Sequence, residues 1–422
     1  MDRNSEAYRR YAEILHEELI PSAGCTDPVA VAYCAALARA ALGGLPEQTE
    51  VAASGNIIKN VKSVVIPNTG GLRGIAAAAA SGVAAGDAGR RLEVLSGITD
   101  EGRKAIRAYM EAHPVRVTPL ESNCVLDIVV TVRGGGHSAS ARIAGGYTNV
   151  VRVERDGKVL RSGPEPGDGT ERNWSCLNVR DIVDFIETVE LEDIAEPVRN
   201  QIACNMALAR AGMEQDFGAN VGKVISRFGG GPEVRARAMA AAAADARMNG
   251  CELPAVILTG SGNQGITASV PVAVWAEHLG CGEERLLRAV ALSDLLTVRQ
   301  KVGIGVMSAF CGAVCAGSAA GAAIAWLQGG GYEEVSHALV NSLAVLSGMV
   351  CDGAKSSCAG KIAMAVEAGI LGYHMYQAGQ EFKGGDGIVT KGVEATVVNV
   401  GRLATDGMRE TDREILKIMV GE

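Results

Sequence analysis

Cysteine is the residue type whose spacing most clearly suggests chemistry in this sequence. Cys351 and Cys358 have six residues between them in VCDGAKSSC, while Cys311 lies forty residues before Cys351 in AFCGAVC, with Cys315 four residues further on. Thiolates are the ligands that iron–sulfur clusters require. A close pair plus a distant third leaves one iron of a four-iron cluster without a protein ligand, and such an iron can act as a Lewis acid.

Two other interpretations of these cysteines stay open on spacing alone. Free cysteines are often small buried hydrophobic residues on packed helices, and zinc also takes thiolate ligands. The chain has only six histidines, none at HxxxH spacing or near these cysteines, so a His-rich zinc site is disfavoured. Eleven cysteines behind a charged N-terminus without a signal-like apolar stretch favour metal binding or catalysis over disulfides. We therefore expect a cytoplasmic protein.

A separate cysteine, Cys25, lies in SAGCTDP just before a predicted helix, with Asp27 as its cap and Pro28 as its first residue. The positive end of a helix stabilises an anion, so we expect the pKa of Cys25 to be lowered, although Asp27 opposes this effect. The pattern predicts a reactive thiolate. A buried cysteine in a turn is the alternative.

Glycine-containing segments carry polar side chains that could orient a small ligand. GSGNQG follows an apolar run and supplies Ser261, Asn263 and Gln264. It matches GxGxxG, but Pro271 interrupts the sequence that follows, so no crossover helix is expected and a dinucleotide site is disfavoured. Two further segments, SGNIIKN and PNTGG, supply Ser54, Asn56, Lys59, Asn60, Asn68 and Thr69. Each of the three segments could also be an ordinary turn.

The elements that must position these groups change in type along the chain. Strand-like runs are expected at 50–53, 61–66, 115–117, 126–132, 142–155 and 158–160, the last two joined by Asp156-Gly157 as a hairpin turn. From residue 178 onward helical patterns predominate, and the polar stretch 162–172 is the best linker candidate. We predict an α+β protein with an N-terminal mixed sheet-and-helix domain (1–172) and a mostly helical cluster-binding domain (173–422).

Composition limits the function classes. The chain of 422 residues is 48% hydrophobic with a net charge of −8 and no basic stripe, so nucleic acid is not expected as a partner. It has 54 glycines and only 4% aromatic residues, so small residues must do much of the packing. Residues 302–332 carry no charge but are mostly small, which predicts a tightly packed buried helix rather than a membrane span.

The segments GCTDP, SGNIIKN, PNTGG, GGYTNVV, GSGNQGI, FCGAVC and CDGAKSSC follow one another in an order that resembles the L-cysteine desulfidase family. That family is related to the alpha chain of iron–sulfur L-serine dehydratases, and the resemblance extends over residues 14–419. It implies a [4Fe–4S] cluster held by Cys311, Cys351 and Cys358, with Cys315 as a bystander.

The same resemblance implies that Cys25 is the general base. It also adds Tyr147 to the candidate substrate-binding residues, at a position where the family often has histidine. The implied reaction is β-elimination of L-cysteine to sulfide, pyruvate and ammonia, with an open cluster iron as Lewis acid and without nicotinamide or pyridoxal phosphate. The expected partner is a small amino-acid substrate, and a homo-oligomer stays open.

Three other functions remain as alternatives. An L-serine dehydratase would use the same cluster chemistry on a different substrate, and the spacing of Cys351 and Cys358 favours the desulfidase branch. A pyridoxal-phosphate β-eliminase is disfavoured because the glycine run at 229–231 precedes the Ser-Gly-Asn segment. An iron–sulfur redox sensor is disfavoured because the chain has no DNA-binding pattern and no basic face.

Overall fold

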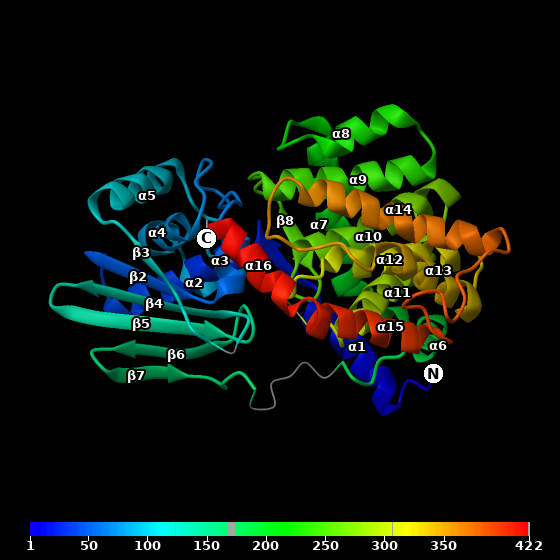
Figure 1. Cartoon of the computed structure of the whole chain (residues 1–422). Helices are drawn as coiled ribbons and strands as arrows, with labels where there is room; N and C mark the ends of the chain where they lie inside the picture. The colour runs from blue at the N-terminus through cyan, green and yellow to red at the C-terminus, as the bar shows by residue number, and fades with distance from the viewer. Residues whose placement is uncertain (123, 168–173, 306, 421–422) are drawn as a thin grey trace.

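A mixed sheet and a helical bundle lie side by side in the computed structural model, which describes residues 1–122, 124–167, 174–305 and 307–420 (Figure 1). The six-stranded sheet has the order β3-β2-β4-β5-β6-β7, and only the β2–β3 pair is parallel. Its strands are β2 (Gln48–Ala53), β3 (Arg116–Pro119), β4 (Asp127–Gly134), β5 (His137–Ala144), β6 (Val150–Arg155) and β7 (Lys158–Ser162). The α+β prediction is confirmed.

Helices pack on the sheet to form the first hydrophobic core. They are α2 (Thr26–Leu42), α3 (Gly55–Val61), α4 (Ile75–Ala85) and α5 (Asp100–Ala112), with a 3-10 turn at Ala88–Glu93. Buried side chains alternate along β2 and β4, as expected for strands with one face on a core. The predicted hairpin turn is confirmed, since Asp156 and Gly157 both have positive φ between β6 and β7.

The second core lies within the helical part. Its helices are α1 (Glu6–Glu18), α6 (Val179–Thr188), α7 (Ala195–Glu214), α8 (Val221–Ile225), α9 (Pro232–Met248), α10 (Gly262–Leu279), α11 (Glu283–Lys301), α12 (Gly312–Leu327), α13 (Tyr332–Leu346), α14 (Cys358–Gln377), α15 (Val393–Arg402) and α16 (Arg409–Val420). Short 3-10 turns occur at Leu191–Asp193 and Ser226–Phe228, and a π-helical turn at Leu403–Gly407. Helix α12 lies within this core, buried from Ala313 to Leu327, in agreement with the buried helix expected there.

Glycine allows the central helices to approach closely. A Cβ at Gly321 of α12 would lie only 2.2 Å from the carbonyl oxygen of Gly369 in α14, and one at Gly317 would lie 2.4 Å from the carbonyl carbon of Ala365. Larger side chains at these positions would separate the two helices. The abundance of glycine and the scarcity of aromatic residues therefore follow from this packing. No helix in the described part of the chain is long and apolar enough to cross a membrane.

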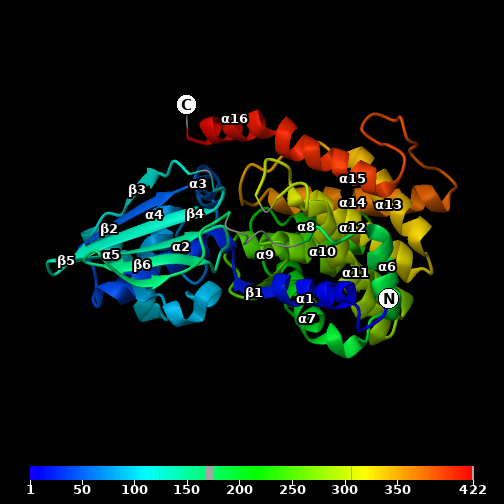
Figure 2. The same ribbon diagram turned by 90° about the horizontal axis from the view of Figure 1, so that it is seen from below.

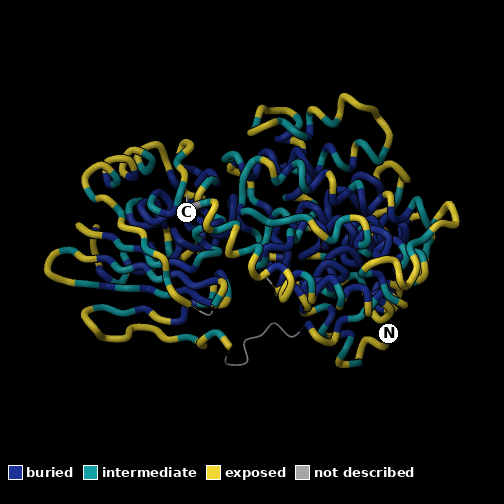
Figure 3. Tube along the Cα trace, in the orientation of Figure 1, coloured by how far each residue is buried: buried dark blue, intermediate teal, exposed yellow. Residues whose placement is uncertain are grey.

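Two segments cross between the sheet part and the helical part. The strand β1 (Ile20–Ala23) pairs antiparallel with β8 (Pro254–Ile257), so the segments that follow each strand are held close to the junction. At the other end of the chain, α16 extends from the helical part and contacts α3 (Figure 2). Buried residues approach the junction from both parts (Figure 3).

The predicted division of the chain into 1–172 and 173–422 stays a prediction, and residues 168–172 of the proposed linker lie outside the described residues. The cores do, however, group α1 with the helical part, because Tyr8, Tyr11 and Ile14 pack in its hydrophobic core. Residues 1–19 thus pack with the helical part, although the predicted division placed them in the sheet-containing domain.

Several predicted elements differ from the observed ones. The expected strand at 61–66 is the end of α3 and a loop, and the expected strand 142–155 is divided between β5 and β6 by a turn. Helix α10 starts at Gly262 and continues through Pro271, so the prediction that this proline interrupts the helix is wrong. The preceding strand β8 nevertheless pairs antiparallel with β1, which is not the parallel crossover of a dinucleotide fold.

Candidate active site

One cavity at the junction of the two parts gathers most of the predicted site residues. It contains about 840 Å³ of space outside the protein atoms, part of it open to solvent. The predicted residues that line it are Cys25, Asn56, Lys59, Asn60, Tyr147, Ser261, Asn263, Gln264, Cys311, Cys351 and Cys358. Residues far apart in the sequence therefore meet at one place.

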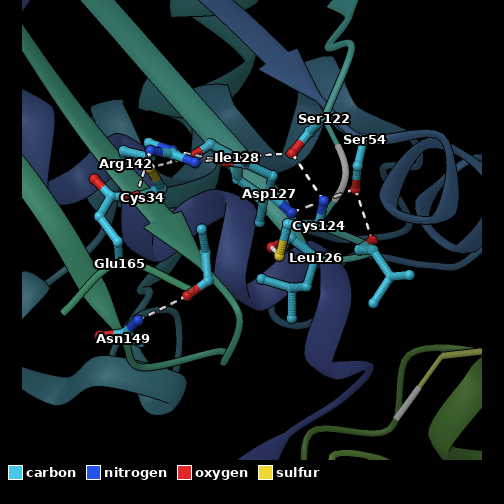
Figure 4. Close-up of polar contacts among 12 residues, drawn as sticks. Cys34, Ser54, Ser122, Cys124, Leu126, Asp127, Ile128, Arg142, Asn149 and Glu165 are labelled. Carbon is cyan, nitrogen blue, oxygen red and sulfur yellow. Dashed lines mark hydrogen bonds and ion pairs between the residues drawn. The ribbon is translucent and has the colours of Figure 1, made fainter. Parts of the chain in front are cut away.

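Three predicted residues lie outside this cavity. Ser54 donates a hydrogen bond to the carbonyl oxygen of Val125 at 2.8 Å, and its side chain points to the segment that carries Leu126 and Asp127 (Figure 4). Asn68 donates to the carbonyl oxygen of Leu95 at 2.9 Å, and Thr69 to that of Ile66 at 2.7 Å. All three are buried and engaged in holding loops, so they do not line the cavity as substrate ligands would.

Helix N-termini converge on the cavity. Cys25 is the N-cap of α2, Cys311 is the N-cap of α12, and Cys358 is the first residue of α14, while Ser261 is the N-cap of α10. All of these residues line the cavity. The positive ends of four long helices therefore face one space, which favours anions such as thiolates and carboxylates.

The local structure explains how Cys311 and Cys351 come together. Phe310 and Val350 form an isolated antiparallel bridge, the N–H of Cys311 donates to the carbonyl oxygen of Met349 at 3.0 Å, and that of Cys351 donates to Ala309 at 2.6 Å. The two cysteines thus occupy neighbouring positions on paired segments. Burial raises the pKa of Cys311 to about 12, and the adjacent Cys351 thiol adds to this effect.

The third cysteine of the set is close to both Cys25 and a lysine. Cys358 packs with Cys25, Val64 and Met248 in a small apolar cluster. One turn after Cys358, Lys361 donates to the carbonyl oxygen of Val350 at 2.7 Å, and its positive charge lowers the pKa values of both Cys311 and Cys358, although burial raises them overall. The cavity wall therefore carries a lysine beside the cysteines, although Lys361 also pairs with the carboxylate of Asp352.

Cys315 is separate from this group. It is fully buried within α12 and does not line the cavity. Its carbonyl oxygen accepts hydrogen bonds from Gln300 at 2.9 Å and Ser318 at 2.9 Å, as part of the helix packing. This placement agrees with the expectation of a bystander.

The surroundings of Cys25 differ from the expected ones. The helix begins at Thr26 with Cys25 itself as N-cap, so the prediction that Asp27 caps it is wrong. Burial raises the pKa of Cys25 to about 12, although the positive charge of Arg247 acts in the opposite direction. The expected lowering of this pKa is therefore also wrong, because desolvation of the thiolate outweighs the helix end and the arginine.

Asp27 is a cavity residue that the sequence analysis named as a helix cap but not as a site residue. It is buried, and its carboxylate accepts hydrogen bonds from the Tyr147 hydroxyl at 3.2 Å and from the Asn60 amide at 3.3 Å. Burial raises its pKa to about 6, against the effects of Tyr147 and of the Arg247 charge. A carboxylate with such a pKa can exchange protons near neutral pH.

Three cationic side chains of the cavity were also not predicted as site residues from the sequence. Arg247, Lys301 and Lys361 line it, and Arg247 and Lys301 are almost completely buried. A buried charge on an otherwise apolar helix face is the signal that could have identified Arg247 and Lys301, because lysine and arginine are rarely buried without a role.

Cys311, Cys351 and Cys358 surround a space rather than a single point. Among the described residues, no three His, Cys, Asp or Glu side chains are gathered tightly enough to ligate a single metal ion. The thiolates of a four-iron cluster each bind a different iron, so they need to surround a space rather than converge on one point. Cys311, Cys351 and Cys358 around one cavity, with helix N-termini and Lys361 opposing their negative charge, fit that requirement.

Comparisons with known proteins show the family of this chain. The family model for the serine dehydratase alpha chain matches residues 89–417. A UPF0597 protein of Desulfitobacterium hafniense (strain Y51) is 48% identical over 425 residues, covering 100% of this chain and 99% of that protein. UPF0597 proteins of Treponema denticola and Lachnoclostridium phytofermentans are 39% and 42% identical, covering 100% and 98% of this chain and 100% of each relative.

The family is generally associated with iron–sulfur clusters, and its activity is of the lyase type. The match spans the cavity cysteines Cys311, Cys351 and Cys358. From the family model and the full-length relatives together, this chain belongs to the serine dehydratase alpha chain family of iron–sulfur lyases.

Proposed function

We propose that this protein is an iron–sulfur-dependent L-cysteine desulfidase of the cytoplasm, which converts L-cysteine to sulfide, pyruvate and ammonia. The observation that carries the proposal is that Cys25, Cys311, Cys351 and Cys358 line one cavity into which the N-termini of α2, α10, α12 and α14 point. A lone reactive cysteine or a purely structural cysteine set would not need this convergence.

The proposed ligands of a [4Fe–4S] cluster are Cys311, Cys351 and Cys358. When bound, such a cluster would supply a Lewis acid at the iron without a protein ligand. The protein's own contribution is to hold the thiolates and offset their charge: two of them start helices, and Lys361 lies beside them.

Cys25 is the proposed base that removes the α-proton of the substrate. Its thiol must first ionise, which burial opposes and Arg247 favours. The ammonium group of an amino acid would add a further positive charge to the cavity, so we propose that Cys25 ionises when substrate is bound. The electrons of the Cα–H bond then form the Cα–Cβ double bond as the C–S bond breaks and sulfide leaves. Water hydrolyses the resulting aminoacrylate to pyruvate and ammonia.

Polar side chains of the cavity would orient the amino acid. Asn56 and Asn60 come from α3, and Asn263 and Gln264 come from the first turn of α10. A Cβ at Gly312 would lie 2.5 Å from the Gln264 amide carbon, so glycine there makes room for this side chain. We propose that these amides bind the substrate's polar groups.

Cysteine as substrate is supported by the surroundings of Cys25. The cavity lining that includes Cys25 and Cys358 also contains the apolar side chains of Met307, Phe310, Ala354 and Ile362. A thiol side chain tolerates such a surface better than a hydroxyl group does, because a hydroxyl needs hydrogen-bond partners. L-Serine dehydratase activity is the second candidate, and the family match favours it.

Serine variants of Cys311, Cys351 and Cys358, each reconstituted with iron and sulfide under anaerobic conditions, test the proposed ligands. The wild-type protein should contain about four irons per chain, and each variant should lose the cluster absorbance. Cys176→Ser, at an exposed position, is the matched control and should retain it. If all three variants keep full iron content, the ligand assignment is wrong.

Cys25→Ala tests the base. It should keep the iron content and the visible spectrum but lower kcat for L-cysteine by about 10²–10⁴-fold, the range of general-base contributions. A variant that turns over at a near-normal rate would overturn the assignment of Cys25.

A further inference from the structure

We infer that Arg247 binds the α-carboxylate of the substrate together with the N-terminus of α10, so that the site selects amino acids with a free carboxylate. The inference rests on the proposed function, because that proposal puts an amino acid in this cavity. Arg247 lies in the last turn of α9 and lines the cavity wall.

Burial of Arg247 calls for an anionic partner. Only 3% of the residue is exposed, its Nη1 donates to the Asn263 side-chain oxygen at 3.0 Å, and its Nε has no hydrogen-bond partner. In the part of the chain that the structure describes, no carboxylate forms an ion pair with this guanidinium. A guanidinium has five N–H donors, and burying its charge without a partner is costly. The charge of Arg247 acts on the Asp27 carboxylate without a direct ion pair, and a ligand carboxylate in the cavity would supply a direct anionic partner.

The position of the guanidinium matches this role. A Cβ at Gly262 would lie 2.3 Å from Arg247 Nε and 2.6 Å from its Cζ, so the guanidinium packs directly against the first residue of α10. The first N–H groups of a helix have no partner within the helix, and the N-cap Ser261 makes no capping hydrogen bond with its side chain. Arginine and helix N–H groups thus offer donors for one carboxylate from two directions.

The position of Arg247 also relates carboxylate binding to the proposed removal of the α-proton by Cys25. Met248, the residue after Arg247, packs against Cys25, and the charge of Arg247 acts on the Cys25 thiol. The α-carbon of an amino acid is bonded directly to its carboxylate carbon. A carboxylate held by Arg247 therefore brings the α-proton to the side of the cavity where Cys25 lies.

The rival explanation is that Arg247 only supports the loop that carries Asn263. Binding measurements distinguish carboxylate binding from loop support, because loss of a residue that only supports the loop would weaken the binding of all ligands alike. The ligands are L-alanine, which lacks a leaving group, and L-alaninamide, which lacks the carboxylate. Titration calorimetry on the reconstituted protein is compared for wild type, Arg247→Gln and Arg247→Lys. Arg235→Gln, an exposed position on the same helix, is the control.

Wild type and the control should bind L-alanine at least about tenfold more tightly than L-alaninamide. Arg247→Gln should weaken L-alanine binding by about 10–100-fold, the size of a lost charge-assisted contact, and leave L-alaninamide and the visible spectrum unchanged. Arg247→Lys should recover part of the loss. With L-cysteine, KM should rise more than kcat falls.

If Arg247→Gln still prefers L-alanine over its amide to the wild-type degree, or weakens both ligands equally, the inference is overturned while the proposed function stands. If reconstituted wild type neither binds amino acids nor acts on L-cysteine, the proposed function fails and the inference with it.

Discussion

The hydroxyl of Tyr147 donates a hydrogen bond to the carboxylate of Asp27 at 3.2 Å, inside the cavity that also contains Cys25. Tyr147 follows β5 in the sheet part, and Asp27 lies in the first turn of α2. This contact therefore joins two segments of the sheet part at the point where they face the helical part. It also places a hydrogen-bond donor on the carboxylate closest in sequence to the proposed base.

Asp27→Asn should stabilise the protein at neutral pH. Burial raises the pKa of Asp27 from 3.8 to about 6 in the folded protein, so the folded state holds this proton more tightly than the unfolded state. The free energy of unfolding therefore falls as pH rises from about 4 to about 6. The asparagine variant avoids this loss and should gain at most about 3 kcal/mol at pH 7.5 and little at pH 4.

Chemical denaturation of Asp27→Asn and wild type at several pH values measures this gain. Asp216→Asn is the comparison of opposite sign: Lys223 lowers the pKa of this exposed carboxylate, so the variant should lose rather than gain stability relative to wild type as pH rises from 4 to 7.5. A pH-independent difference for Asp27→Asn would show that Asp27 does not hold its proton unusually tightly.

Tyr147→Phe should raise the pKa of Asp27 further, because the lost hydrogen bond stabilises the ionised carboxylate. If turnover requires the ionised form of Asp27 beside Cys25, the acid limb of the kcat/KM profile for L-cysteine should move to higher pH by about one unit, the equivalent of one hydrogen bond to a charged group. Stopped assays between pH 5 and pH 9 measure the shift. An unchanged acid limb would mean that Asp27 does not govern it.

Gly262→Ala should displace the Arg247 guanidinium, because the new Cβ would overlap its Nε and Cζ. KM for L-cysteine should rise about tenfold, while iron content stays normal. Gly360→Ala, within α14 and with no atom near its added Cβ, is the matched control and should leave KM unchanged. Equal KM values for wild type and Gly262→Ala would show that the position of Arg247 does not matter for binding.

Asp412→Asn should loosen the contact between α16 and α3. Asp412 accepts a hydrogen bond at 2.5 Å from Lys59, which is only 2% exposed and lines the cavity. Loss of the pair leaves a buried lysine without its carboxylate and should cost about 1–2 kcal/mol, since Asp412 itself is partly exposed. Hydrogen exchange of α16 should speed up, whereas Glu410→Gln, which removes only an exposed pair with Arg413 on the same helix, should have a much smaller effect. Unchanged exchange in Asp412→Asn would contradict a role for this pair.

The sequence allowed the fold class to be predicted, because helical periodicity and strand-like runs are local signals, whereas the grouping of the cysteines followed from the family resemblance. It did not allow the neighbours of Cys25 to be predicted. Whether its pKa rises or falls depends on the depth of burial and on Arg247, which lies more than two hundred residues away in the sequence. Polar motif residues such as Ser54 and Asn68 were assigned to the substrate because the sequence cannot distinguish a side chain that binds a ligand from one that holds a loop.

The central claim is tested most directly by measuring sulfide release from L-cysteine and pyruvate release from L-serine in the same anaerobically reconstituted sample. We expect sulfide and pyruvate in equal amounts from L-cysteine, with kcat/KM for L-cysteine well above that for L-serine, and no sulfide from Cys25→Ala. Pyruvate from L-serine with no sulfide from L-cysteine would contradict desulfidase activity and assign the protein as a serine dehydratase.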